Sequence, residues 1–132
     1  MESKMIICDT DVLIELLDNK RNRHNFTKEI INEVGIENVL LTAISRMELI
    51  KGAIHKNDSI QIAKKIKKFD TILINPEITL RSIDLINSYH LSHGLNIPDA
   101  LIAATSIEVE IELFTFNIRD FKFIKHLNLF KY

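Results

Sequence analysis

A short, fully apolar run followed by two aspartates limits how this chain can fold. The run Met5–Cys8 is typical of a strand that is buried on both faces, and apolar residues then recur at helical spacing between Val12 and Leu17. The first unit is therefore predicted to be a strand, an acidic turn and a helix. Open parallel sheets bind ligands where strands end and helices begin, so Asp9 and Asp11 stand where chemistry is expected.

The same two acids have a structural interpretation. Asp9 or Thr10 fits the N-cap position of the helix that follows, and Asp11 in the first turn would interact favourably with the helix dipole. Caps are far commoner than active sites. The choice between the two interpretations therefore depends on acids elsewhere in the chain.

Composition and charge restrict the class of protein. With 132 residues, 46% of them hydrophobic, the chain is expected to form one domain over residues 1–132. Lys and Arg number 17 against 18 Asp and Glu, so no overall positive field marks a nucleic-acid-binding protein. Contacts to RNA would require local basic patches. Two are candidates, Lys20–Arg23 and Lys64–Lys68, although a solvated surface is the favoured interpretation of each.

The expected compartment is a reducing cytoplasm. Cys8 is the only cysteine, so no internal disulfide can form. No apolar run approaches the ~18 residues of a membrane span, and the segment from Met1 to Lys4 leads into too short an apolar stretch for a signal peptide. The histidines show no zinc-ligand spacing with cysteine, and the three glycines form no phosphate-binding loop.

Strand and helix patterns alternate along the chain. Strands are predicted at residues 5–8, 39–41, 71–74 and 113–116, and helices at 12–17, 26–34, 42–54, 59–68, 76–90 and from about 98 to 106. This alternation predicts an α/β single domain with a short, mainly parallel sheet flanked by helices.

Glu48 has two interpretations. Ser45 and Glu48 have the spacing of a capping box, in which the Glu only closes the helix start. If the helix instead begins at Thr42, Glu48 lies in its second turn at the edge of an apolar stripe and is partly buried. A buried carboxylate needs a partner, which would be a metal ion or the nearby Lys51.

Two further acidic positions follow late in the chain. Asp99 comes just after Pro98 and heads a helix face of apolar and small residues, although an acid in a first turn is also favourable by itself. Polar residues from Asn117 to Asp120 follow the last predicted strand. Acids or amides therefore recur at the ends of strands or the starts of helices.

Four motifs in this order resemble the PIN-domain family, and within it the VapC-type toxins of toxin–antitoxin pairs. They are Asp9-Thr10-Asp11-Val12-Leu13-Ile14, Ser45-Arg46-Met47-Glu48-Leu49, Pro98-Asp99-Ala100-Leu101-Ile102-Ala103-Ala104 and Thr115-Phe116-Asn117-Ile118-Arg119-Asp120-Phe121. Each motif is weak alone. Together they span nearly the whole chain at family-like spacing.

The resemblance implies a metal-dependent endoribonuclease that uses Mg²⁺ or Mn²⁺ to activate a water for RNA cleavage. Asp9, Glu48 and Asp99 would be its catalytic and principal metal-binding residues. The fourth family position falls near Asn117 or Asp120, and Asp120 is a candidate ligand because an Asn stands at the first of the two.

Other residues of the motifs would support this set. The family commonly has Asn at the position of Asp11, so this acid is either an additional ligand or a hydrogen-bonding residue. Ser45 and Thr115 would orient the ligands. Arg46 and Arg119 would hold phosphate or simply be exposed.

The resemblance also implies partners: a cognate antitoxin that inserts an Arg or Lys into the acidic groove, an RNA substrate and a second copy of the chain in a homodimer. Two alternatives stay open. The Asp-Thr-Asp motif also resembles haloacid-dehalogenase phosphatases, in which Asp9 would be the nucleophile, but that family needs a later acidic pair and leaves Glu48 without a role. A PIN-like scaffold that binds RNA or protein without catalysis is the other.

Overall fold

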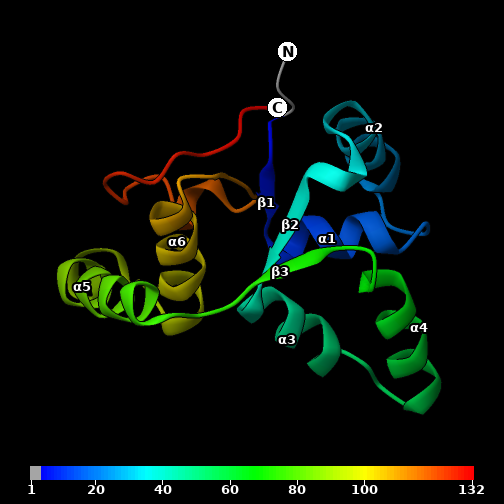
Figure 1. The fold of residues 1–132 in the computed structure, drawn as a ribbon, viewed down its shortest axis with the longest axis horizontal. Helices are drawn as coiled ribbons and strands as arrows, with labels where there is room; N and C mark the ends of the chain where they lie inside the picture. The colour runs from blue at the N-terminus through cyan, green and yellow to red at the C-terminus, as the bar shows by residue number, and fades with distance from the viewer. Residues whose placement is uncertain (1–3) are drawn as a thin grey trace.

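A computed structural model of the chain describes residues 4–132. Residues 1–3, which the sequence prediction includes in the single domain, lie outside the described residues. The described chain forms four strands, six α-helices and two short 3₁₀ helices (Figure 1). In chain order these are β1 (Ile6–Cys8), α1 (Thr10–Leu17), α2 (His24–Val34), η1 (Ile36–Asn38), β2 (Val39–Thr42), α3 (Ala43–Lys51), α4 (Lys56–Ile66), β3 (Asp70–Ile72), α5 (Pro76–His93), α6 (Ile97–Val109), β4 (Glu112–Phe114) and η2 (Ile118–Asp120).

The four strands form one sheet in the order β3-β2-β1-β4, and every neighbouring pair is parallel. The prediction of an α/β domain with a mainly parallel sheet is confirmed. β1 lies in the interior of the sheet, where Ile6 pairs with Val39 on one side and Glu112 on the other. All four carboxyl ends consequently lie at the same edge.

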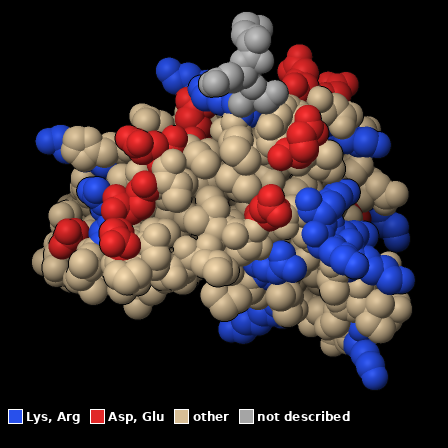
Figure 2. Space-filling view, in the orientation of Figure 1, with Lys and Arg blue, Asp and Glu red and all other residues tan. Residues whose placement is uncertain are grey.

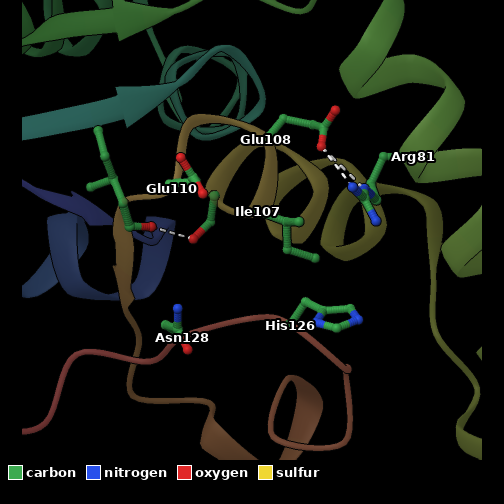
Figure 3. A pocket seen from close by; sticks show the side chains of 8 residues that line it. Arg81, Ile107, Glu108, Glu110, His126 and Asn128 are labelled. Carbon is green, nitrogen blue, oxygen red and sulfur yellow. Dashed lines mark hydrogen bonds and ion pairs between the residues drawn. The ribbon is translucent and has the colours of Figure 1, made fainter.

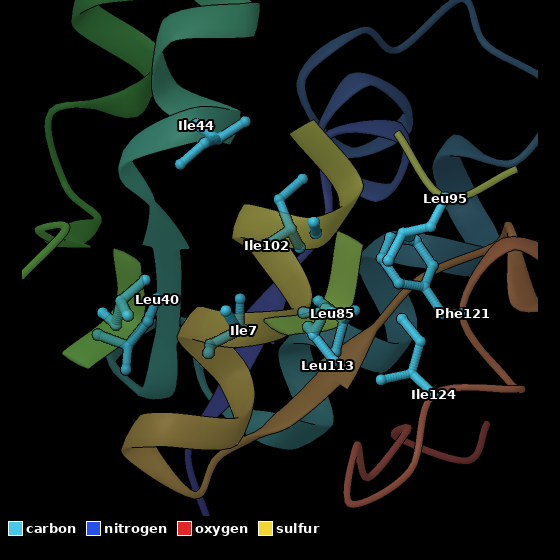
Figure 4. Packing of buried hydrophobic residues seen from close by; sticks show 13 residues of the cluster. Ile7, Leu40, Ile44, Leu85, Leu95, Ile102, Leu113, Phe121 and Ile124 are labelled. Carbon is cyan, nitrogen blue, oxygen red and sulfur yellow. The ribbon is translucent and has the colours of Figure 1, made fainter. Parts of the chain in front are cut away.

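The sheet separates two hydrophobic cores, because successive side chains of a strand point to opposite faces. Ile7 of β1 packs into a cluster with residues of α5 and α6, such as Leu85 and Ile102 (Figure 4). Ile6 and Cys8 face the other cluster, whose further members come mainly from α1, α2, α3 and α4. Cys8 is fully buried, and burial raises the pKa of its thiol far above the ordinary value. β1 is therefore covered on both faces, as its apolar sequence predicts.

Several predicted boundaries differ from the structure. The helix predicted over 42–54 runs only from Ala43 to Lys51, with Thr42 as its N-cap and Gly52 as its C-cap. The helix predicted over 59–68 runs from Lys56 to Ile66, since His55 caps it by accepting the Asp58 N–H at 3.3 Å. The strands predicted over 71–74 and 113–116 end at Ile72 and Phe114.

The carboxyl-terminal segment covers the outer edge of β4. Leu113 donates its N–H to the Asn128 carbonyl at 3.0 Å and accepts from the Phe130 N–H at 2.8 Å. This pairing protects an edge that would otherwise offer free backbone groups to other chains. Within residues 4–132, no helix has the length and apolar character needed to cross a membrane.

Candidate active site at the carboxyl ends of the strands

Asp9 follows directly after β1 and is the most deeply buried acid of the site, with only 5% of its surface exposed. Its Oδ1 accepts the Thr10 N–H at 2.7 Å, and its Oδ2 accepts the Thr115 hydroxyl proton at 2.8 Å. Its own N–H donates to the Phe114 carbonyl at 2.9 Å. Asp9 is the N-cap of α1, as the structural interpretation predicted, and is also tied to the end of β4.

Asp11 lies in the first turn of α1 and is held in part by the segment that follows β4. One carboxylate oxygen accepts the Val12 N–H at 2.8 Å, and the other accepts the Phe116 N–H at 3.0 Å. Thr115 in turn accepts the Asn117 N–H through its hydroxyl at 3.0 Å. The segment that follows β4 therefore orients both aspartates of the first motif.

Glu48 lies in the second turn of α3, and the capping-box interpretation is wrong. Thr42 is the cap, since its hydroxyl accepts the Ser45 N–H at 3.0 Å. Glu48 is exposed rather than partly buried, and its Oε1 accepts the Thr10 hydroxyl proton at 2.7 Å. No ion pair joins Glu48 to Lys51 in the described part of the chain.

Thr10 connects two of the motifs and was not predicted to do so. Its hydroxyl donates to Glu48 and lies 2.9 Å from the hydroxyl oxygen of buried Ser45. Because a hydroxyl carries one proton, the Ser45 hydroxyl can supply the proton of the second bond. The position of Ser45 supports its predicted role in orienting the acids, with Thr10 as the intermediary. The signal in the sequence was a hydroxyl between two aspartates at a strand end.

Asp99 stands in the first turn of α6, and Asn96 caps this helix. The Asn96 Oδ1 accepts the Asp99 N–H at 2.9 Å, which fixes the backbone that carries the carboxylate. The capping role of Asn96 was not predicted from the sequence. The spacing from Asn96 to Pro98, with Pro near the start of the helix, was the available signal.

The charges of these acids act on one another. The pKa of Asp9 is raised to about 7, chiefly by burial and then by the charge of the neighbouring Asp11. Burial also raises the pKa of Asp11. The pKa of Asp99 is raised to about 6, first by burial and then by the charges of Asp9, Asp120 and Glu48. Acids from four separate segments therefore share one electrostatic environment at the carboxyl edge of the sheet.

This donor set fits a hard divalent cation. None of the five acids takes part in an ion pair with Lys, Arg or His within the range 4–132, so the site carries uncompensated negative charge. Oxygen ligands suit Mg²⁺ and Mn²⁺. No three His, Cys, Asp or Glu side chains in the described residues are close enough together to enclose an ion. Mg²⁺ does not need such an enclosure, because it usually binds through one or two carboxylates and keeps several waters.

Two predicted phosphate-binding arginines are placed differently. Arg46 extends from α3 toward β3, where its guanidinium donates to the Thr71 hydroxyl at 2.9 Å. Arg119 is exposed on η2 beside Asp120, and Asn117 is exposed just before it. The structure therefore gives Arg46 a contact at the outer strand, whereas Arg119 stays at the acidic edge.

Two other surface features lie outside the acidic site. A polar cavity of about 460 Å³ lies at the other end of α6 from Asp99, and the Arg81–Glu108 ion pair of 2.9 Å lines it (Figure 3). Figure 2 shows basic side chains gathered around the carboxyl-terminal end of α4. Lys65, in the last turn of α4, donates to the Leu17 carbonyl at 3.0 Å. The cavity borders the amino-terminal end of β4, where parallel sheets seldom bind ligands.

Comparison with known proteins gives one family and several similar structures. Residues 6–127 match the family model of the PIN domain. No curated protein shows significant sequence similarity to the chain. A chain of a toxin–antitoxin complex from Klebsiella pneumoniae is 28% identical, with a TM-score of 0.74 over 92% of this chain and 94% of that one.

Two further structures are similar at lower identity and show the fold alone. FitAcB from Neisseria gonorrhoeae has a TM-score of 0.77 at 22% identity, over 96% of this chain and 97% of that chain. VapBC-1 from nontypeable Haemophilus influenzae has a TM-score of 0.77 at 23% identity, with the same coverage of 96% and 97%. Because the family model matches nearly the whole described fold, this chain belongs to the PIN-domain family.

Proposed function

We propose that this protein is a metal-dependent endoribonuclease and the toxin of a toxin–antitoxin pair. PIN domains are generally nucleases that use divalent metal ions, and the 28% identical structure is a chain of a toxin–antitoxin complex. The observation that carries the proposal is that Asp9, Glu48, Asp99 and Asp120 form no ion pair within residues 4–132, while the first, second and fourth act electrostatically on Asp99 at the carboxyl edge of the sheet. The haloacid-dehalogenase alternative loses its support, because the family match is to the PIN domain.

Each acid has a role in this proposal. Asp9, Glu48 and Asp99 would hold Mg²⁺ or Mn²⁺, directly or through water, and Asp120 would contribute from η2. A bound ion would stabilise negative charge on the phosphate and lower the pKa of the attacking water. Asp11 would keep the segment after β4 in position through the Phe116 N–H.

Two threonine hydroxyl groups donate hydrogen bonds to acids of the site. The Thr115 hydroxyl donates to Asp9, and the Thr10 hydroxyl donates to Glu48. A hydrogen bond donated to a carboxylate stabilises the charged form, which is the form that binds a cation. The Thr115 hydroxyl therefore opposes the rise in the pKa of Asp9 that burial and the neighbouring Asp11 cause.

The proposed partners follow from charge and exposure. An antitoxin that presents an Arg or Lys to the unpaired carboxylates would neutralise them and silence the enzyme. A homodimer would cover the exposed apolar side chains on α3, α5 and α6, among them Met47, Ile83 and Ile97, which are 57%, 53% and 67% exposed. The free, buried Cys8 is compatible with the reducing cytoplasm, where the protein would encounter its RNA substrate.

Cleavage of total cellular RNA by the purified, antitoxin-free protein tests the activity. We expect discrete cuts with Mg²⁺ or Mn²⁺ that are lost in EDTA and in the Asp9→Asn variant. The matched control is Asp84→Asn, an exposed acid on α5, which should cut like the parent. Cutting that persists in EDTA or in Asp9→Asn would refute the proposed mechanism.

Metal binding separates the nuclease from a non-catalytic scaffold. Mn²⁺ should raise the melting temperature of the parent more than that of Asp99→Asn, because an ion that binds only the folded state stabilises it. Equal shifts would mean that the acids do not bind the ion. The protein would then be a PIN-like scaffold.

A further inference from the structure

A second chemical surface lies immediately beside Asp11. An open pocket of about 250 Å³ is lined by Asp11, Glu15, Arg21, Arg23, Phe116 and Asn117. These side chains come from α1, the loop before α2 and the segment after β4. The pocket therefore shares Asp11 and the Phe116 backbone with the acidic site but has its own side chains.

Arg23 is placed in an unusual way. Its guanidinium carbon lies 4.7 Å from the centroid of the Phe116 ring, so the cation sits over the aromatic face. Arg23 occupies the N-cap position of α2 but makes no side-chain cap hydrogen bond there. A positive charge at a helix N-terminus also opposes the helix dipole. Arg23 is therefore an unfavourable residue at this helix start, and such locally unfavourable residues are expected at functional sites.

The ring beneath Arg23 is firmly supported. Phe116 makes an edge contact with Phe114 at 5.4 Å between ring centroids and a second with Tyr132 at 5.6 Å. Phe26 lies 6.4 Å away at 39°. The guanidinium is exposed and takes part in no ion pair in the described residues. The guanidinium therefore lies over a supported ring while the residue that carries it is exposed to solvent.

The charges of the pocket balance. Arg21 pairs with Glu15 at 2.9 Å, and the pocket lining holds one further cation, Arg23, and one further acid, Asp11. A pocket with no net charge has little attraction for a phosphate. A planar guanidinium, with an exposed amide from Asn117 nearby, suits a nucleobase, which stacks on flat groups and offers donors and acceptors at its edges.

We propose that Arg23, held on Phe116, is a stacking platform for one unpaired base of the RNA substrate, which thereby positions the adjoining backbone at the acidic site. The inference rests on the proposed function, since it names a subsite of that nuclease. Asn117 contacts the edge of the same base. The substrate is then single-stranded at this position, because a paired base has no free face to offer.

Binding of single-stranded oligoadenylate to the Asp99→Asn protein in Mg²⁺ tests this subsite without cutting the RNA. Adding Arg23→Ala should weaken binding roughly tenfold, as the loss of one base stack does. Arg23→Lys should lose as much, because an ammonium keeps the charge but has no planar face. Phe116→Leu should cause a smaller loss, and Lys28→Ala, an exposed cation on α2, should change affinity less than about twofold.

An abasic scan identifies the contact itself. One abasic position should weaken binding to the protein with Arg23 and have no effect with Arg23→Ala. Equal sensitivity in both proteins, or full affinity in Arg23→Lys, would overturn the proposal, and the second result would identify a phosphate contact. Variants that change affinity only for an antitoxin would assign the pocket to protein docking and also overturn it.

The outcomes separate the subsite from the enzyme. A parent protein that cuts RNA while Arg23→Ala and Arg23→Lys bind and cut equally well would refute the subsite alone. A parent protein that neither binds nor cuts RNA would refute the nuclease and the subsite with it. Thermal unfolding of each variant shows whether it is folded, and Arg23 is exposed, so its replacement should leave the melting temperature close to that of the parent.

Discussion

Replacing Asp99 by Asn should make the metal-free protein more stable. The pKa of this carboxyl is raised from an ordinary 3.8 to about 6 by burial and by the charges of Asp9, Asp120 and Glu48. At a pH well above 6 the folded protein carries a charge that its surroundings disfavour. Asn is nearly the same size and carries no charge, so Asp99→Asn removes this penalty.

The magnitude follows from the displacement of the pKa. A change from 3.8 to about 6 corresponds to about 3 kcal/mol of unfolding free energy, at about 1.4 kcal/mol per pH unit. Asp99 is partly exposed, and solvent screening reduces the value, so we take about 1.5 kcal/mol. For a chain of this length that amounts to about 5 °C in melting temperature.

The pH dependence has a definite sign. An acid whose folded pKa lies above its unfolded pKa binds protons more tightly in the folded state, so lower pH favours folding. The penalty is complete above a pH of about 6 and disappears as the pH falls toward 3.8. The advantage of Asp99→Asn should therefore be largest at about pH 8 and nearly absent at about pH 4.

Urea unfolding in EDTA at the two pH values measures this difference, with Asp84→Asn as the control for an exposed acid. Saturating Mg²⁺ should stabilise the parent and reverse the order of stability, because the variant lacks one ligand. A variant that is no more stable than the parent at about pH 8 without metal would refute the electrostatic reasoning. An advantage that is equal at both pH values would refute the titration of Asp99 as its cause.

Three further perturbations test separate parts of the structure. Thr115→Val removes the hydrogen bond that opposes the raised pKa of Asp9, so the acid limb of the pH profile for RNA cleavage should move above about pH 7, and an unmoved limb would contradict this role. Leu13→Ala in the core should cost about 2–5 kcal/mol in urea unfolding. Arg81→Gln should cost less than about 1 kcal/mol and leave cleavage unchanged, because the Arg81–Glu108 pair is partly exposed and distant from the acids; reduced cleavage would link its cavity to the activity.

The sheet was predictable from sequence because its strands have a simple signature. β1 is buried on both faces and reads as a continuous apolar run, and Asp9 ends it without ambiguity. Element ends were less predictable. Ile54 continues an apolar pattern past the helix that ends at Lys51, yet it is 89% exposed, because nothing in the described chain packs on it.

The partners of the acids were harder to predict than the acids. Glu48 was expected to find a cation or Lys51, but its contact is Thr10, a residue 38 positions away. Such a bond depends on how α1 and α3 pack against each other, and the spacing of residues within one motif does not predict it. Arg46 shows the same limit: its place in the family-like motif suggested a phosphate contact or an exposed side chain, whereas packing brings it to Thr71.

The pairing of β1 with β4 determines when the site can form during synthesis of the protein. The Thr115 hydroxyl that holds Asp9 comes from a position 106 residues later, and the Phe116 N–H that holds Asp11 from one 105 residues later. Proteins are synthesised from the N-terminus at about 5–20 residues per second. A nascent chain on the ribosome therefore carries Asp9, Asp11 and Glu48 for seconds before the strand that organises the two aspartates has emerged. The site of the proposed ribonuclease therefore cannot assemble until the segment that follows β4 has been synthesised.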